Sequence, residues 1–596
     1  MATKRYSIKD FLEIKSSHSP SINFDGSYIV FLNNNSGTSQ LYLFDRKEDK
    51  ITQLTDYADY IAGAVFSPTE NIVIFGKAEG GNEKTQLFLL DITTKEVTPL
   101  TTNTEVKYGF DGFSTNGKKI LLSSNERNGT DLDIFIMDLA TKESTVVFAE
   151  GGYCTGKGFS SNDNYVIISK FDSNVNNDLY LVDLKTNKST QITNHDVETV
   201  YDGPQWLGDE SGFFVTTNLD KDFLGIAFYE LKTNQFSYKV TPDWDVDEFI
   251  LSKDDTKLGY IVNEDGYNRL YLVSTKDFTE ILPAPFTNGL FTSISFDQSA
   301  HNLSFGFLSA VKPRNVYVWD LKNNITTKFG NSSCPIPEET FVEPALIRYK
   351  SFDGLEISAF LYTTKENNNA PAVVSIHGGP ESQYQPIFSA LTQFLIYNGY
   401  VVITPNVRGS SGYGKHFLSL DNIEKRLDSV KDIEYLVKHL NESQLVNPEK
   451  IAVMGGSYGG FMVLACMCFY PELFVAGVDI VGIANLVTFL ENTAPHRRAL
   501  RESEYGYLDQ DRKFLESISP INHIEKIIAP LMVIHGANDP RVPLNEAHQV
   551  KDKLKKLGRK VELLVYEDEG HGLGKLKNIL DAYPKIVQFL DKILKA

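Results

Sequence analysis

The sequence IAVMGGSYGGFM occupies residues 451–462 and contains a Gly-x-Ser-x-Gly element centred on Ser457. One apolar run ends just before the element and another, residues 461–466, follows it, a pattern that predicts a strand, a sharp turn and a helix. Glycines suit such a turn because the serine has strained backbone angles and a Cβ on its neighbours would collide with the adjoining strand or helix. Ser457 is therefore a candidate nucleophile, although the pentapeptide alone is also compatible with an ordinary tight turn.

A serine nucleophile needs a base to accept its proton and a carboxylate to orient that base. Both follow Ser457 in the order Ser, Asp, His that α/β-hydrolases use. Asp539 comes after the apolar run 531–534, and His571 comes after the alternating run 561–566. Because open α/β sheets place their active sites at the carboxyl ends of the strands, these positions predict a triad of Ser457, Asp539 and His571.

Other polar residues near these motifs have alternative interpretations. Asp568 and Glu569 lie close in sequence to His571 and could orient it, but Asp539 is favoured because it follows a separate strand. We expect His535, near the end of an apolar strand, to be a packed and hydrogen-bonded core histidine. Arg408 lies in a glycine-rich loop without the Lys-Ser/Thr of a P-loop, so we expect it to hold that loop by hydrogen bonds.

A fourth element, VVSIHGGP at residues 373–380, is another apolar strand that ends in a glycine pair. Such a pair offers a backbone N–H to the negative oxygen that forms during acyl transfer. We expect the amides of Tyr458 and Gly379 to form this oxyanion hole. His377 either contributes to that side of the site, beside the substrate, or only shapes the turn.

Internal repeats fill the first half of the chain. Each copy contains several short runs rich in Val, Ile, Tyr and Phe that alternate or are continuous, as strands do. A period of 44 to 47 residues with several strands per copy predicts a β-propeller, and seven copies predict seven blades. The Asp that recurs in most copies is expected to accept backbone N–H bonds in a turn rather than to bind a metal. The corresponding positions are Asp45, Asp91, Asp138, Asp183, Glu230, Ser274 and Asp320.

Five strings resemble, in order and spacing, the prolyl oligopeptidase family of serine peptidases, most closely its acylaminoacyl-peptidase-like branch. They are HGGP (377–380), NVRGSSGYG (406–414), GGSYGGFM (455–462), HGANDPRVP (535–543) and GHG (570–572). The resemblance implies the same triad and the same oxyanion amides, and it places Arg541 beside the substrate. It also implies a propeller that covers the active site and admits only short or unfolded peptides.

The predicted fold class is thus two-domain, with an N-terminal seven-bladed β-propeller and a C-terminal α/β-hydrolase domain. We expect the propeller to span residues 17–330, a polar, proline-containing linker 331–344, and the catalytic domain 345–596. Residues 1–16 form a separate N-terminal segment with a short capped helix near its end. In the resembled family such a segment packs on the hydrolase domain.

Composition limits the partners and the location. A net charge of −19 over 596 residues argues against binding to nucleic acid or to anionic lipid. No apolar run reaches the roughly 18 residues of a membrane span, and no signal peptide precedes the first repeat. The four scattered cysteines are expected to be reduced, in a cytoplasmic protein. Without a His-Glu-x-x-His or Cys-x-x-Cys motif, we predict no metal and no other cofactor.

These features predict a serine peptidase that cleaves short peptides through an acyl-enzyme intermediate. Preference for blocked or free N-termini stays open, with Asp247 and Glu248 as candidates to hold a free ammonium group. An S1 pocket is expected within residues 486–507, from Phe489, Tyr505 and Tyr507. The alternatives are a carboxylesterase with the same triad, and a propeller binding module with an inert hydrolase domain. The oligomeric state is not predicted.

Overall fold

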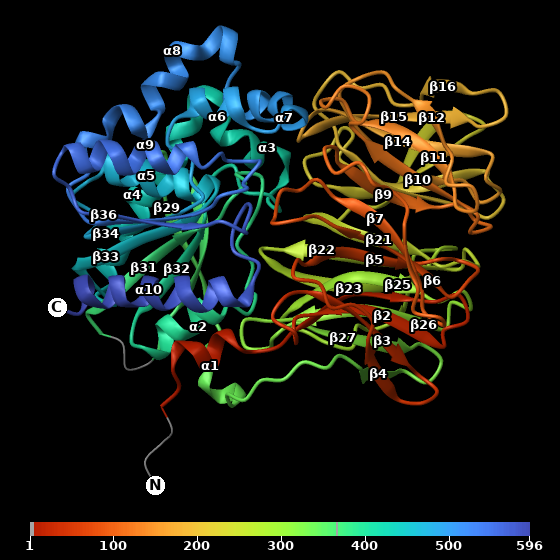
Figure 1. Ribbon diagram of the computed structural model, residues 1–596, viewed down its shortest axis with the longest axis horizontal. Coiled ribbons are helices and arrows are strands. Elements are labelled where there is room, and N and C mark those ends of the chain that lie inside the picture. The colour runs from red at the N-terminus through yellow and green to blue at the C-terminus, as the bar shows by residue number, and fades with distance from the viewer. Residues whose placement is uncertain (1–4, 365–367) are drawn as a thin grey trace.

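A computed structural model describes residues 5–364 and 368–596. The chain forms two domains that lie side by side, the first made of strands and the second of a sheet covered by helices (Figure 1). Over these residues, seven four-stranded antiparallel sheets form the first domain and one eight-stranded sheet forms the second. The predicted two-domain fold class is therefore confirmed.

Each blade of the propeller consists of four strands that are consecutive in the chain and pair in that order. In blades 1 to 3 the strands are β1 (Ser17–Ile22), β2 (Tyr28–Asn33), β3 (Gln40–Asp45), β4 (Lys50–Gln53), β5 (Ile61–Phe66), β6 (Ile72–Lys77), β7 (Gln86–Asp91), β8 (Val97–Pro99), β9 (Tyr108–Phe113), β10 (Lys119–Ser124), β11 (Asp133–Asp138) and β12 (Ser144–Phe148). In blades 4 to 7 they are β13 (Tyr153–Phe159), β14 (Tyr165–Ser173), β15 (Asn176–Asp183), β16 (Lys188–Gln191), β17 (Tyr201–Trp206), β18 (Gly212–Thr217), β19 (Gly225–Glu230), β20 (Gln235–Val240), β21 (Asp245–Leu251), β22 (Lys257–Glu264), β23 (Tyr267–Ser274), β24 (Glu280–Leu282), β25 (Leu290–Phe296), β26 (Asn302–Leu308), β27 (Asn315–Asp320) and β28 (Ile325–Lys328).

The recurring aspartates end the third strand of their blades and cap the turn to the fourth. In each, Oδ1 accepts backbone N–H bonds of 2.7 to 3.1 Å from the residues two and three positions further on. This is the Asx geometry that favours Asp in tight turns. The predicted turn role is confirmed for Asp45, Asp91, Asp138, Asp183 and Asp320.

The second domain is built on one mixed sheet with the strand order β29-β30-β32-β31-β33-β34-β35-β36. The central strand of the first three, β30, runs antiparallel to both of its neighbours, and the strands from β32 onward run parallel to one another. Their bounds are β29 (Ala345–Lys350), β30 (Glu356–Tyr362), β31 (Ala370–Ile376), β32 (Val401–Asn406), β33 (Val446–Gly456), β34 (Ala476–Ile480), β35 (Leu531–Gly536) and β36 (Val561–Tyr566).

Helices cover both faces of this sheet and bury its apolar side chains in two separate cores. One core includes Val430 and Val550, and the other includes Phe394 and Ile586. The helices are α2 (Ala390–Tyr397), α3 (Gly414–Leu418), α4 (Arg426–Ser443), α5 (Tyr458–Phe469), α6 (Leu486–Asn492), α7 (Pro495–Tyr505), α8 (Leu508–Ile518), α9 (Asn545–Lys556) and α10 (Leu576–Leu594), with short 3-10 turns at Glu338–Thr340, Ser419–Asp421, Ile423–Lys425 and Pro520–Lys526.

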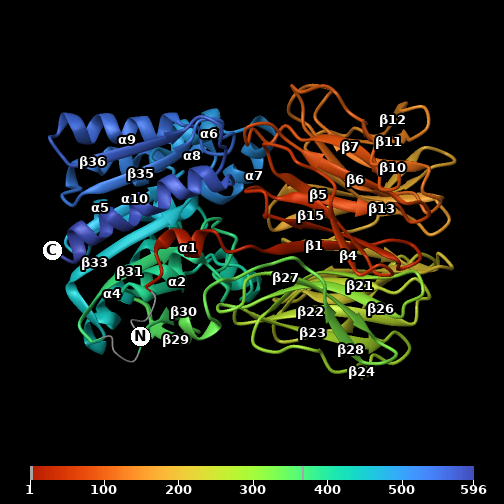
Figure 2. The same ribbon diagram turned by 60° about the horizontal axis from the view of Figure 1, so that its bottom comes forward.

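The N-terminal helix α1 (Ile8–Leu12) precedes the propeller in the chain but lies against α2 and α10 of the second domain (Figure 2). Ser7 caps it in a capping box with Asp10. The fully buried Phe11 ring packs edge-on against Phe341 and Phe394. Helix α1 therefore belongs to the core of the second domain. Within the described ranges, no helix is both long and apolar enough to cross a membrane.

Candidate active site

Ser457 lies on the sharp turn between β33 and α5, with φ 58° and ψ −120°. A left-handed φ is strained for a serine, and such strain is common at functional sites. The neighbouring glycines are needed for space, because a Cβ on Gly455 would lie 2.4 Å from the Gly459 carbonyl oxygen. A Cβ on Gly459 would lie 2.2 Å from the carbonyl oxygen of Ile376. The glycine requirement inferred from the sequence is thus present in the fold.

His571 contacts Asp539 at the carboxyl edge of the parallel strands. Its Nδ1 lies 2.7 Å from Asp539 Oδ2. The other carboxylate oxygen, Oδ1, accepts the backbone N–H groups of Arg541 and Val542 at 2.8 and 3.0 Å. The side chain of Asp539 is fully buried, so these bonds fix one oxygen toward its own loop and the other toward the imidazole.

The other two carboxylates near His571 are engaged elsewhere. Asp568 forms ion pairs with Lys575 and Lys577. Glu569 accepts the backbone N–H groups of Gly574 and Lys575. It is therefore Asp539 that contacts the imidazole.

Two further histidines end strands of the sheet. His535 is fully buried, and its Nε2 donates to the Val542 carbonyl oxygen at 2.8 Å. Burial lowers its pKa, which keeps the ring neutral and agrees with the expected packed core histidine. The ring of His377 is bonded on both sides, with Nδ1 2.7 Å from the Gly378 carbonyl oxygen and Nε2 2.8 Å from Ser410 Oγ. Burial lowers the pKa of His377 to about 4, so the side chain is a neutral support for the turn.

Arg408 has the structural role expected for it. Its guanidinium is 3% exposed and donates to Asp432 at 2.9 to 3.1 Å and to Asp353 at 3.0 and 3.2 Å. The pair with Asp432 is buried, so the loop is anchored to α4 by charge-assisted hydrogen bonds.

The predicted oxyanion groups lie next to Ser457. Tyr458 is the first residue of α5, where backbone N–H groups have no partner within the helix. Gly378 packs directly on the nucleophile, since a Cβ at Gly378 would be 3.3 Å from Ser457 Cβ. Gly379 follows with φ 124°, a conformation that side chains rarely adopt.

Ser457 and His571 line a cavity of about 330 Å³ at the boundary of the two domains. Phe489 and Tyr505, which were expected in an S1 pocket, line this cavity. Tyr507, the third residue expected there, does not line it and is 44% exposed. The other lining residues are Asn174, Gly379, Glu381, Ile483, Arg497, Arg501, Arg541 and Val542.

Asp247 and Glu248, the adjacent acids that were candidates to hold a free ammonium group, do not line this cavity. Glu248 instead accepts the N–H groups of Ser293 and Ile294 at 3.1 and 2.9 Å, which joins blade 6 to blade 7. His377 is likewise not one of the described residues that line the cavity. The acidic side chain that does line the cavity is Glu381.

Several cavity residues were not predicted from the sequence. Glu381 directly follows the HGGP string and bonds both Arg501 of α7, at 3.3 Å, and Asn174 of the propeller. Its adjacency to that motif is a signal that was available in the sequence. Arg497 and Arg501 are four apart and so share one face of α7, a spacing that also could have indicated them.

A buried polar network holds Tyr458, the residue that follows Ser457. The Tyr458 hydroxyl donates to Asp421 at 3.0 Å, and Arg426 bridges Asp421 and Glu504. Burial raises the pKa of Asp421 to about 6 and raises that of Glu504 well above its ordinary value. The turn that carries Ser457 therefore rests on a fully enclosed set of hydrogen bonds.

The hairpin between β6 and β7 of the propeller contacts both loops that carry the candidate acid and the candidate base. Asn538 Nδ2 donates to the Gly80 carbonyl oxygen at 3.0 Å, and Arg541 Nε lies 2.5 Å from Glu83. Gly81 packs so tightly on Gly570 that a Cβ would lie 2.3 Å from its backbone nitrogen. The loops of the candidate acid Asp539 and the candidate base His571 are thus in direct contact with blade 2.

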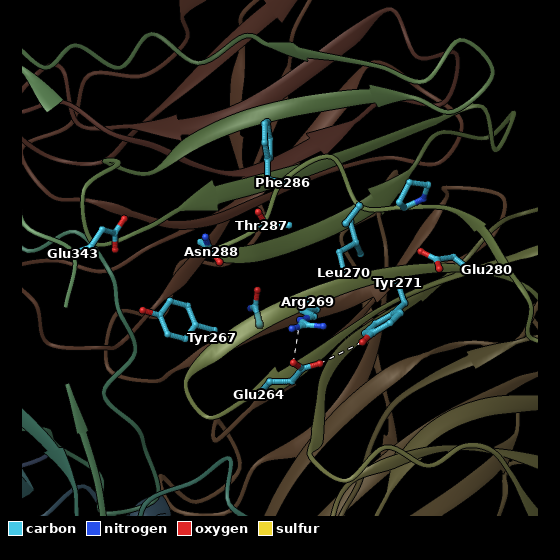
Figure 3. A pocket seen from close by; sticks show the side chains of 13 residues that line it. Glu264, Tyr267, Arg269, Leu270, Tyr271, Glu280, Phe286, Thr287, Asn288 and Glu343 are labelled. Carbon is cyan, nitrogen blue, oxygen red and sulfur yellow. Dashed lines mark hydrogen bonds and ion pairs between the residues drawn. The ribbon is translucent and has the colours of Figure 1, made fainter. Parts of the chain in front are cut away.

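A larger cavity, of about 920 Å³, opens at the edge of blade 6 (Figure 3). Figure 3 shows Glu264 facing Arg269 and Tyr271, with which it forms an ion pair of 3.0 Å and a hydrogen bond of 3.3 Å. These polar groups satisfy one another, and the lining contains none of the triad candidates. We therefore place the candidate active site in the smaller cavity, on chemistry rather than on size.

Comparison with known protein families shows to which family the chain belongs. The prolyl oligopeptidase N-terminal β-propeller domain matches residues 48–331, and the prolyl oligopeptidase family domain matches residues 386–596. The chain belongs to the prolyl oligopeptidase family. Acylamino-acid-releasing enzymes occur among its relatives, and the expected family and its acylaminoacyl-peptidase-like branch are confirmed.

Relatives within the prolyl oligopeptidase family carry several names. Dipeptidyl peptidase family member 6 of Caenorhabditis elegans is 36% identical over 331 residues, which are 51% of this chain and 44% of that protein. Dipeptidyl aminopeptidase BIII of Pseudoxanthomonas mexicana is 29% identical over 286 residues, 46% and 42% of the two chains. Acylamino-acid-releasing enzyme 1 of Oryza sativa subsp. japonica is 30% identical over 251 residues, 40% and 32%. The match spans less than half the length of each of these three relatives.

Solved structures share the fold over nearly the whole chain. A puromycin-hydrolyzing peptidase of Mycobacterium tuberculosis has a TM-score of 0.88 at 16% identity and covers 99% of this chain and 96% of its own. Pyrococcus horikoshii acylaminoacyl peptidase has a TM-score of 0.76 at 18% identity, with coverage of 99% and 98%. At these identities the likeness establishes the fold alone.

Proposed function

We propose that this chain is a serine peptidase that hydrolyses short peptides, with Ser457 as nucleophile, His571 as base and Asp539 as the orienting acid. The observation that carries the proposal is the 2.7 Å contact between His571 Nδ1 and Asp539 Oδ2, at a cavity that Ser457 also lines. Nucleophile, base and acid on separate strand ends are the constellation that activates a serine hydroxyl.

In the proposed reaction, Ser457 Oγ attacks the peptide carbonyl while His571 Nε2 accepts the hydroxyl proton. Asp539 accepts the Nδ1–H bond, which holds the tautomer and stabilises the imidazolium that forms. The amides of Tyr458 and Gly379 stabilise the negative oxygen of the tetrahedral intermediate. His571 then gives the proton to the leaving amine, and water hydrolyses the acyl-enzyme by the same steps.

The propeller limits the size of the substrate in this proposal. The cavity is near the lower end of the volume range of small-molecule pockets, which suits a few residues rather than a folded chain. Blade 2 contacts the loops of Asn538 and Gly570, and Asn174 of blade 4 lines the cavity itself. Arg541, held by Glu83 of the propeller, is then in position beside the substrate.

The test uses purified protein and its Ser457→Ala variant on four chromogenic substrate classes: N-acetyl-aminoacyl, free-amine aminoacyl, N-blocked peptidyl and simple ester. Turnover of peptide or acylaminoacyl substrates that disappears in the variant is the expected result. Turnover of esters alone would favour a carboxylesterase. Absence of any Ser457-dependent turnover would favour a propeller binding module with an inert hydrolase domain.

A further inference from the structure

Three arginines converge on the candidate active-site cavity, and they are not equally paired. Arg501 faces Glu381 at 3.3 Å, and Arg541 faces Glu83 at 2.5 Å. Arg497 has no ion pair and no side-chain hydrogen bond within the described parts of the chain, and its Nε is buried without a partner. One guanidinium therefore faces the cavity with its donors unused.

The buried Nε of Arg497 is costly, because this donor has given up water without gaining a hydrogen-bond partner. Burial, and then the positive charges of Arg541 and Arg501, lower the pKa of Arg497, and the negative charge of Glu83 offsets this only in part. Lys107 of the propeller adds a fourth positive charge that acts on Arg497's neighbour His496. The chain carries a net charge of −19, so this local excess of positive charge runs against its overall balance.

The surroundings hold Arg497 in place without neutralising it. The loop before α7 is tied to the loop of Asp539, since Ala494 N donates to the Pro540 carbonyl oxygen at 2.9 Å and Thr493 Oγ1 to that of Arg541 at 2.8 Å. On the propeller side, α7 packs against β14, and the ring of His496 lies against Tyr153. Arg497 thus presents a fixed positive fork to whatever occupies the cavity.

We propose that Arg497 binds a carboxylate of the peptide substrate; this rests on the proposed peptidase function. A guanidinium fork matches a carboxylate in shape and charge, and the bidentate pair is stronger than a neutral hydrogen bond. The carboxylate belongs either to a free C-terminus or to an Asp or Glu side chain. A cavity of about 330 Å³ keeps both close to the reacting carbonyl, because it holds only a short peptide.

The experiment compares two matched pairs of N-acetylated peptides. In one pair the C-terminus is a free acid or an amide, and in the other an amidated peptide contains Glu or Gln. Wild-type protein is expected to favour the carboxylate-bearing member of at least one pair by about 10- to 100-fold in kcat/KM. The pair that shows the preference identifies the source of the carboxylate.

Arg497→Ala is expected to abolish this preference while the amidated, uncharged peptides are still cleaved. Arg498→Ala is the matched control, because Arg498 is next on the same helix, pairs with Glu502 at 3.1 Å and does not line the cavity. Equal cleavage of acid and amide, and of Glu and Gln, by wild-type protein would overturn the proposal. So would a preference that survives in Arg497→Ala.

Two further measurements separate this proposal from its premises. Calorimetric binding of the same peptides to Ser457→Ala and to Ser457→Ala/Arg497→Ala tests the carboxylate site even when no peptide is turned over. A preference for the acid only in the first protein supports the site, and equal affinities overturn it. Arg497→Ala is also expected to melt no lower than Arg498→Ala, since it removes a buried Nε that has no hydrogen-bond partner. A lower melting temperature would assign Arg497 to folding instead.

Discussion

Replacement of Gly81 by Ala would test whether the propeller positions His571, the proposed base. Gly81 has φ +77°, and its added Cβ would lie 2.3 Å from the backbone nitrogen and 2.8 Å from the Cα of Gly570, next to His571. Backbone atoms cannot rotate away, so reaching an ordinary contact of 3.4 Å requires the two loops to separate by about 1 Å. A misplacement of that size near reacting groups costs about 100-fold in rate.

The matched control is Gly129→Ala. Gly129 has φ +76°, nearly the same as Gly81, but a Cβ there would meet nothing within 4 Å. Both variants therefore incur the same left-handed backbone cost of about 1–2 kcal/mol, and only Gly81→Ala disturbs the contact with the second domain. The melting temperature of Gly81→Ala is expected to fall at least as far as that of Gly129→Ala, because its Cβ also strains the contact between the domains.

The assay is kcat/KM on the best substrate of the four-class panel, measured beside thermal unfolding. Gly81→Ala is expected to lose about 100-fold in kcat/KM, and Gly129→Ala less than about twofold. If the two variants have the same kcat/KM, blade 2 does not set the position of His571, and the reasoning from the Gly81–Gly570 contact is refuted.

Three further predictions concern the triad and the buried charges. In Asp539→Asn the side-chain oxygen should still accept the two loop amides, so that the NH2 group faces His571 Nδ1 and forces the wrong tautomer of the imidazole. The kcat should fall by about 10⁴. A loss below tenfold would contradict the triad. Burial raises the pKa of Glu546 to about 7. The folded state therefore binds this proton more tightly than the unfolded state, and its contribution to the free energy of unfolding is fully present below about pH 4.5. That contribution, up to about 3 kcal/mol, is lost as the pH rises through 7. Glu546→Gln should flatten the decline of melting temperature between about pH 5 and pH 8, and parallel profiles would count against the raised pKa. Arg408→Ala leaves the buried Asp432 charge unpaired and should reduce the free energy of unfolding by about 3–5 kcal/mol in denaturant titration, whereas a change below about 1 kcal/mol would show that the pair contributes little.

Most of the fold could be predicted from sequence patterns between residues that lie close together in the chain. The strand, turn and helix around Ser457 depend on residues within about ten positions, where apolar periodicity and glycine placement are visible. The seven blades were predictable because each blade is made of consecutive strands and repeats its turn chemistry, as at Asp45 and Asp320. The contact between the triad candidates Asp539 and His571 was expected from motif order along the chain.

Side-chain direction and through-space pairing limited the prediction of the cavity. Tyr507 belongs to the same aromatic stretch as Phe489 and Tyr505, but it lies at the cap of α8 and faces solvent. Asp247 and Glu248 are adjacent acids, and nothing local shows that Glu248 is used between two blades. Such errors are expected where a residue's surroundings come from distant parts of the chain.

The sequence by itself determined the two-domain fold, the blade number and the candidate nucleophile, acid and base, because local periodicity and motif order encode them. The tertiary structure alone decided which charges are neutralised. Glu83 pairs with Arg541 across 458 positions of sequence, and Glu381 pairs with Arg501 across 120. Arg497 is left without a partner because ion pairs depend on distance in space and on burial, not on separation along the chain.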